Sequence, residues 1–329
     1  MLPVPRKIPG RIAVVAAIAI LLIAGAALFD QFMVKQTIGE VESRWEEANK
    51  LSEKGQHEQA LIIYGSVFEL ISPDEFPKQY GMNHYYCGKT YGGMASQVNA
   101  SGNLQNSISA YNVAARYLAK ENHPGEFALV QYGLGDACLN LYGLNNRKGD
   151  LQTAINYYEE SLSYYTVASD PHYFASANNR LGNAYRKMGV RQNDSEYLLA
   201  AVKSYNESLR VFRKNVYPVE YAGVQNNLGN LYLEISEFTD KRSNINKAVA
   251  AYNSALDILT IDAQPVEYAT VQNNLGNAYF ELSAIENKKV NSEKAASSYH
   301  QSLKVFTVNR FPVEHEGIMD NIAKVYSNL

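Results

Sequence analysis

Apolar residues recur along most of this chain with the spacing of amphipathic helices. From residue 41 onward they return at intervals of three or four, as do Ala248, Tyr252 and Leu256. This spacing places them on one face of a helix. Short polar stretches such as NNRKGD and TDKRSN separate the helical segments. The pattern predicts an all-α protein built from antiparallel helix pairs.

The helical segments repeat with a constant period. The segment PVEYATVQNNLGNAY begins at Pro265, and the similar segment PVEYAGVQNNLGNLY begins 47 residues earlier, at Pro218. Prolines keep this interval at positions 77, 124, 171, 218, 265 and 312. Proline suits the first position of a helix, where its missing N–H needs no partner. A fixed period of this length is typical of a solenoid, in which each unit buries its apolar face against its neighbours.

Each unit has one signature in each helix. The first helix carries Leu-Gly-x-x-Tyr, as in Leu228, Gly229 and Tyr232, and the second carries Ala-x-x-x-Tyr, as in Ala248 and Tyr252. Glycine in mid-helix costs about 1 kcal/mol against alanine, so its return predicts a close approach of two helices. Polar residues predict the N-caps of the second helices. They are Asn103, Asp150, Asn244 and Asn291.

Together, the two signatures resemble both helices of the tetratricopeptide repeat (TPR). The resemblance covers residues 41–329 and implies a right-handed TPR-type superhelical solenoid. These 47-residue units are longer than the standard TPR and are similar to the long units of kinesin light chains and of many bacterial repeat proteins. We expect units at about 41–76, 77–123, 124–170, 171–217, 218–264 and 265–311, with a terminal helix at 312–329.

The N-terminal end has a different character. Residues 1–11 form a basic segment, and residues 12–29 form an uncharged apolar run long enough for a transmembrane helix. The preceding basic residues place the N-terminus inside and the repeats outside the cytoplasm. We therefore expect a single-pass signal anchor in the cell membrane, with residues 30–40 as a linker or a continuation of the helix. A cleaved signal peptide, leaving the repeats secreted or periplasmic, is the alternative.

The sequence contains no pattern that predicts catalysis. The six histidines are scattered, and neither a Cys/His zinc spacing nor a phosphate-binding loop is present. A formal net charge of −3 argues against a nucleic-acid partner, which needs a basic surface. Cys87 and Cys138 fall on the inward stripe of successive first helices, one turn out of register, and we expect two buried free thiols. We expect no enzymatic activity, no cofactor and no metal.

Asparagine gathers on the first helices, off the Leu/Tyr stripe. Pairs spaced by four residues return in successive units: Asn179 and Asn183, Asn226 and Asn230, Asn273 and Asn277. In TPR proteins the first helix lines the concave, ligand-contacting surface, and these rows resemble the asparagine ladder of the TPR superhelix in O-GlcNAc transferase. Side-chain amides both donate and accept hydrogen bonds, which suits an extended peptide backbone. The alternative is that these amides brace the solenoid itself.

The sequence thus predicts a membrane-anchored, non-enzymatic TPR scaffold that binds a protein or an extended peptide in its concave groove. Arg180 and Arg186 would add positive charge to this surface, and an aromatic end would be formed by Tyr85, Tyr86 and Tyr132. The alternative is a structural protein that assembles into a homo-oligomer. The terminal helix at 312–329 has no second helix of its own, so its outer side is either a polar cap or a docking surface.

Overall fold

The computed structural model describes residues 10–327 of the 329-residue chain. This range contains thirteen helices and no strand, which confirms the predicted all-α fold of paired helices. Nearly all of the basic segment predicted at residues 1–11 lies outside the described residues. The chain divides into two compact units, residues 1–119 and residues 120–329.

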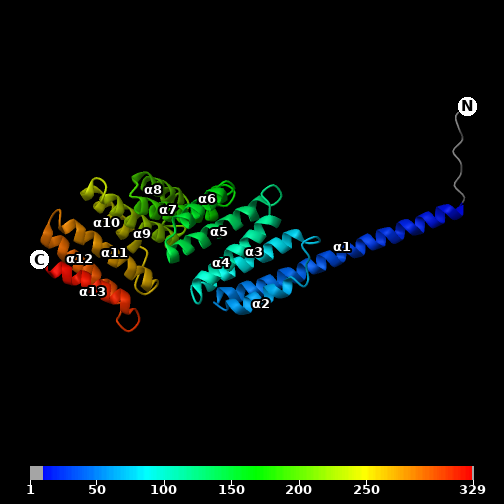
Figure 1. Cartoon of the computed structure of the whole chain (residues 1–329), viewed down its shortest axis with the longest axis horizontal. Helices are drawn as coiled ribbons and strands as arrows, with labels where there is room; N and C mark the ends of the chain where they lie inside the picture. The colour runs from blue at the N-terminus through cyan, green and yellow to red at the C-terminus, as the bar shows by residue number, and fades with distance from the viewer. Residues whose placement is uncertain (1–9, 328–329) are drawn as a thin grey trace, which may run out of the picture. The chain divides into compact units, whose positions relative to one another are not determined.

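The first unit begins with one long helix, α1, which runs from Gly10 to Glu53 without a break (Figure 1). Residues 30–40 therefore continue the apolar helix. Side chains such as Leu21, Leu22 and Ile23 are about 70% exposed. By length and composition this helix can cross a membrane, although a signal sequence would meet the same criteria. The other helices of the unit are α2 (His57–Val67), α3 (Pro77–Met94) and α4 (Ala100–Tyr117).

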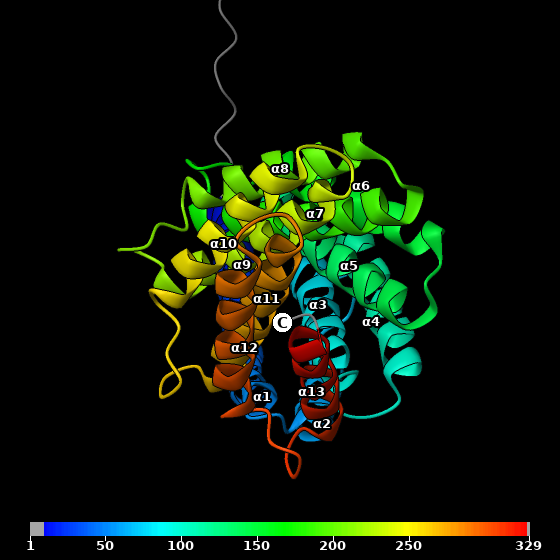
Figure 2. The same ribbon diagram turned by 90° about the vertical axis from the view of Figure 1, so that its left-hand side faces the viewer.

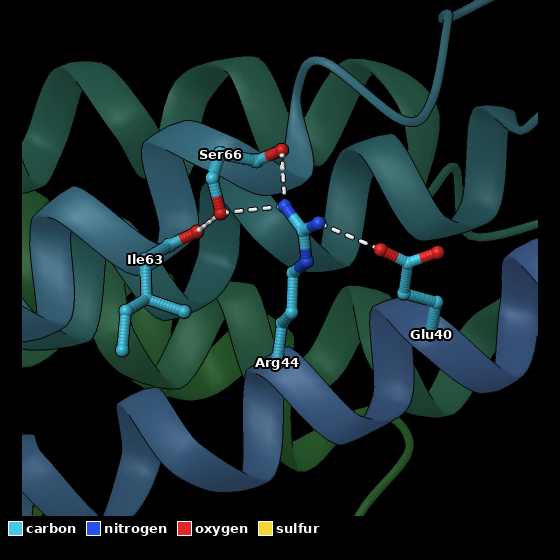
Figure 3. Close-up of polar contacts among 4 residues, drawn as sticks. All are labelled: Glu40, Arg44, Ile63 and Ser66. Atoms are coloured by element: carbon cyan, nitrogen blue, oxygen red, sulfur yellow. Dashed lines mark hydrogen bonds and ion pairs between the residues drawn. The ribbon is translucent and has the colours of Figure 1, made fainter.

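Hydrogen bonds connect the C-terminal part of α1 to α2 (Figure 3). The Arg44 guanidinium donates hydrogen bonds to the backbone oxygen of Ser66 at 3.0 Å and to its Oγ at 2.8 Å. The other guanidinium nitrogen pairs with Glu40 at 2.6 Å. The hydroxyl of Ser66 in turn donates to the Ile63 carbonyl. These contacts, together with the burial of Val41, hold the end of α1 against the first helix pair.

The second unit stacks four helix pairs and a last helix (Figures 1 and 2). Each first helix begins at the repeat proline, as predicted. Each second helix also packs on the first helix of the next pair. The helices are α5 (Pro124–Asn145), α6 (Lys148–Leu162), α7 (Pro171–Gln192), α8 (Ser195–Leu209), α9 (Pro218–Ser236), α10 (Lys241–Leu256), α11 (Pro265–Ser283), α12 (Lys288–Leu303) and α13 (Pro312–Ser327).

The predicted N-caps of the second helices are wrong. In α10 the N-cap is Asp240, which has a φ of 41°, and Asn244 lies inside the first turn. The amide of Asn244 donates back to the carbonyl of Thr239 at 2.7 Å. Asn103 and Asn291 make the same bond in α4 and α12, and α6 begins before Asp150. The backbone is left-handed at five loop positions 47 residues apart, Asn99, Asn146, Asn193, Asp240 and Asn287.

The repeat glycines allow the close approach that the sequence predicts. A Cβ placed on Gly276 would lie 2.6 Å from the ring of Tyr299, and one on Gly182 would lie 2.7 Å from Tyr205. These tyrosines come from the second helix of the same pair and are at most 1% exposed. Because a real Cβ does not approach that closely, the pairs are built around the missing side chain.

Candidate functional site

The asparagine that follows each repeat glycine is bonded to the buried tyrosine of its own helix pair. Tyr252 donates to Oδ1 of Asn230 at 2.7 Å. Tyr205 bonds Asn183 at 2.8 Å, and Tyr299 bonds Asn277 at 2.7 Å. Asp136 accepts the equivalent bond from Tyr158, and Asn49 accepts it from Tyr64. At these positions the side-chain oxygen braces the helix pair, and a carboxylate does so as well as an amide.

The other asparagine row links successive first helices. Asn227 of α9 donates through Nδ2 to Oδ1 of Asn179 in α7 at 3.0 Å. One unit later, Asn274 of α11 donates in the same way to Asn226 of α9, also at 3.0 Å. Asn227 and Asn274 follow the predicted Asn226 and Asn273 directly in the sequence and are not themselves among the predicted site residues. In the structure they are the donors that join one first helix to the next.

This row is interrupted at α13. By repeat position Asn321 should donate to Asn273, but it lies 3.4 Å from Oδ1 of Asn277 instead. Oδ1 of Asn273 is buried and has no hydrogen-bond partner within residues 10–327. It lines a cavity of about 590 Å3 between α11 and α13, together with Thr270 and Lys324.

The two rows keep unused hydrogen-bonding capacity. Asn183, Asn230 and Asn277 use their oxygen for tyrosine, and no partner for their Nδ2 groups is found in the described part of the chain. Nδ2 is likewise unpaired there in Asn179 and Asn226, which accept from the next helix. All five side chains are half-buried. The amides are therefore fixed in orientation by one bond and can still donate others.

Both predicted cations are engaged in ion pairs. Nε of Arg180 lies 3.3 Å from Oδ1 of Asp136, and this carboxylate raises the pKa of the guanidinium. Arg186 pairs with Glu234 of α9. Burial raises the pKa of the Glu234 carboxyl, while Arg186 works in the opposite direction. Neither arginine stands as an isolated charge on the helix surface.

The three tyrosines expected to form an aromatic end belong to ring clusters. In the first unit, the Tyr86 ring lies 5.2 Å from Trp45 and 5.4 Å from Tyr85, measured between ring centroids. In the second unit, the Tyr132 ring lies 5.8 Å from Tyr173. Tyr85 is only 7% exposed. These rings contribute first to packing within their own units.

Within residues 10–327, no three His, Cys, Asp or Glu side chains gather as metal ligands would. Cys87 and Cys138 are both free and buried, as predicted. Burial raises the pKa of each thiol to about 12, which keeps both protonated at neutral pH.

Comparison with known proteins adds TPR structures of low identity. No protein-family model matches the chain, and no curated protein matches it. It is similar to the TPR protein TTC0263 of Thermus thermophilus, with 20% identity over 73% of this chain and 98% of that one and a TM-score of 0.44. It is also similar to BtubC (BKLC) of P. vanneervenii, with 17% identity over 87% of this chain and 91% of that one and a TM-score of 0.45. A third similar structure is the TPR2AB domain of yeast Sti1 in a complex with pHSP90. Here the identity is 16% over 88% of this chain and 98% of that one, and the TM-score is 0.29. The assignment of paired helices rests on the contacts within this chain.

Proposed function

We propose that this protein is a membrane-anchored, non-enzymatic TPR scaffold that holds a protein or an extended peptide against the first helices α7, α9 and α11. The observation that supports this function is the set of unpaired Nδ2 groups in the two asparagine rows. Such groups donate to peptide carbonyls, which occur at every residue of any sequence. Binding of this kind selects an extended conformation and tolerates many side chains.

The bonds that brace the solenoid also favour binding. Asn230 is oriented by Tyr252, and Asn226 is oriented by Asn274. A donor that is already fixed loses little side-chain entropy when it binds, so pre-organisation increases affinity. The two interpretations that the sequence left open are therefore compatible, because each amide can brace the fold with its oxygen and bind with its nitrogen.

The test separates these two roles with one substitution. In a triple variant, Asn183→Asp, Asn230→Asp and Asn277→Asp keep the acceptor for tyrosine, as Asp136 shows, and remove the Nδ2 donors. We expect the wild-type protein to bind uncharged peptides taken from a displayed random library, and the variant to bind the same peptides at least about tenfold more weakly. Its melting temperature should fall, because the new carboxylates keep the tyrosine bond but lack the ion pair that Arg180 provides for Asp136, so binding is compared at a temperature where circular dichroism shows both proteins folded. Equal peptide binding by the variant would mean that the asparagines only brace the solenoid.

The anchor is proposed from the exposed apolar helix α1. Leu28, Phe29 and Phe32 are more than 60% exposed, and lipid would cover such a surface at low cost. We expect the full chain to stay in the membrane fraction after alkaline extraction, and protease added outside cells to reach the repeats. The mass of the mature N-terminus distinguishes the anchor from a cleaved signal peptide.

Self-assembly is the second candidate function. It is favoured by three exposed side chains on α13, namely Val313, Met319 and Tyr326, which are 77%, 46% and 57% exposed. If these residues dock on another copy, the mass in solution should rise with concentration, and removing residues 312–329 should abolish the rise. A monomeric mass that stays constant with concentration would rule out self-assembly, and the scaffold would be the remaining candidate function.

A further inference from the structure

A pocket in the second unit gathers positive charge along the C-terminal half of α7. It has a volume of about 500 Å3 and is lined by side chains from α5, α7 and α9 and by the loop residue after α5. The lining residues are Tyr142, Asn146, Arg186, Lys187, Val190, Arg191 and Glu234. Three of them are cations and one is an anion. Only Arg186 among them was predicted from the sequence.

The repeat itself does not require these cations. At the position of Arg186, other units hold Leu139, Leu233 and Phe280. At the position of Lys187, they hold Asn140, Glu234 and Glu281. At the position of Arg191, they hold Leu144, Phe238 and Ile285. The same helix pair is thus built three times with apolar, neutral or acidic residues there, so the fold gives no reason for three basic residues in α7.

The charges within the pocket do not balance. Glu234 pairs with Arg186, yet Oε2 of Glu234 and Nε of Arg186 are buried without a hydrogen-bond partner in the described chain. Lys187 makes no ion pair there, and its ammonium lies 5.9 Å from the centroid of the Tyr142 ring. Arg191 donates only to a neutral acceptor, Oδ1 of Asn146, at 2.9 Å. Two positive charges are therefore left without an anion.

The surroundings of Lys187 show the same deficit. Burial and the neighbouring Arg186 lower the pKa of its ammonium, and Glu234 compensates only in part. An anion bound between these side chains would relieve this repulsion. Arginine forms strong, charge-assisted hydrogen bonds with carboxylates, and these are roughly twice as strong as neutral ones.

We propose that this pocket takes the carboxylate of one acidic side chain of the bound peptide. The inference rests on the proposed function and adds to it a side-chain preference that the asparagine rows do not provide. The ammonium of Lys187 and the guanidinium of Arg191 supply the donors and the two unbalanced charges, and Arg186, which pairs with Glu234, lines the pocket beside them. A phosphorylated side chain would meet the same cations, so the test compares it directly with the carboxylate.

The test compares matched peptides on the full chain in lipid nanodiscs. One set is uncharged except for a Glu placed at each position in turn, and the second set has Gln there. At one position we expect Glu to bind about tenfold more tightly than Gln, measured by fluorescence polarisation. A third set carries phosphoserine. Equal affinity of the Glu and Gln sets at every position would overturn the proposal, and tighter binding of phosphoserine than of Glu would overturn the assignment to a carboxylate.

Substitutions in the pocket assign the preference to it. Lys187→Gln and Arg191→Gln should each lower the Glu/Gln affinity ratio several-fold and leave the affinity for the Gln set unchanged. Glu234→Gln should act in the opposite direction and raise the ratio, because it removes the competing carboxylate. Arg213→Gln, at an exposed position outside the pocket, is the matched control and should have no effect. An unchanged ratio in all three pocket variants would place the acidic side chain elsewhere.

Failure of the proposed function is distinguishable from failure of this inference. If the wild-type protein binds no peptide of any set, the proposed scaffold function fails. The carboxylate site is then tested with single amino acids whose backbone ends are chemically blocked. N-acetyl-glutamate methylamide should then shift the Nε–H NMR signal of Arg191, and its glutamine analogue should not. Equal shifts, or no shift with either compound, would overturn the carboxylate site.

Discussion

The hydroxyl of Tyr252 donates a 2.7 Å hydrogen bond to Oδ1 of Asn230, which lies 22 residues earlier in the chain. The same ring fills the space beside Gly229, which has no side chain. One tyrosine therefore packs the helix pair and orients an amide whose nitrogen stays unpaired. Stability and proposed peptide binding meet at this residue, and they can be separated by substitution.

Removing the hydroxyl should weaken the pair without disturbing its packing. Tyr252→Phe leaves the acceptor of Asn230 half-buried and without its bond, and we expect a loss of about 1 kcal/mol in the free energy of unfolding. Asn230→Asp keeps an acceptor and should cost less. Urea denaturation followed by circular dichroism measures both. No measurable loss in Tyr252→Phe would contradict the prediction, and a larger loss in Asn230→Asp would show that the added charge outweighs the bond that it keeps.

Adding a methyl group should have opposite effects at two glycines of α9. Gly229→Ala places a Cβ against the Tyr252 ring, and we expect a loss of about 1–3 kcal/mol. Gly223→Ala enters open space and should gain up to about 1 kcal/mol from helix propensity. Thermal melting should therefore shift down for Gly229→Ala and up for Gly223→Ala. The pair of α1 and α2 differs, because Ala48 lies at the matching position beside Tyr64 and this pair already accommodates a methyl group.

The stability of the first unit should fall in mild acid because of His84. Burial, and to a smaller extent Arg116, lowers the pKa of this imidazole from 6.5, and its Nε2 is buried without a partner in the described chain. The unfolded chain therefore takes up the proton at a higher pH than the folded chain does. Stability from this group is complete above about pH 6.5 and is lost as pH falls through the lower, folded value.

The variant His84→Phe isolates this effect. Phenylalanine can keep the ring contacts to Phe68 and Tyr80 and does not titrate. The difference in unfolding free energy between the variant and the wild type should grow in favour of the variant between about pH 7 and pH 5. Carboxylates elsewhere titrate alike in both proteins and cancel. A difference that is constant with pH would contradict the prediction.

Both thiols should be unreactive until the chain unfolds. The pKa of Cys87 and of Cys138 is raised to about 12 by burial, and the thiolate is the reactive form. We expect a thiol reagent at pH 8 to label neither residue in the native protein and both in urea. A non-reducing gel should show no disulfide-linked species. Rapid labelling of the folded protein would mean that one of the thiols is accessible.

Much of the fold follows from the sequence. The six prolines and the repeat glycines predict where first helices begin and where helix pairs approach, because both depend on backbone properties of single residues. The apolar spacing predicts which face of each helix is buried. The N-caps were mispredicted, since the amide of Asn244 bonds backward to Thr239 in place of capping the helix. A short polar side chain near a helix start satisfies either geometry, and local sequence does not distinguish them.

The site was predicted only in outline. The sequence indicated Asn230 and Asn226, but their partners are Tyr252, 22 residues later, and Asn274, 48 residues later. The pocket around Lys187 was missed, although a comparison of repeat positions shows it: Lys187 and Arg191 replace apolar, neutral or acidic residues found in the other units.

By itself, the sequence determined the all-α fold and the pairing of its helices, because helix spacing and a constant period are properties of the chain alone. Only the tertiary structure decided which amide nitrogens stay unpaired and where cations gather without anions. Those outcomes depend on the distances between side chains of successive helices. For example, Asn226 accepts a hydrogen bond from Asn274 of the next first helix, whereas the equivalent Asn273 has no such donor.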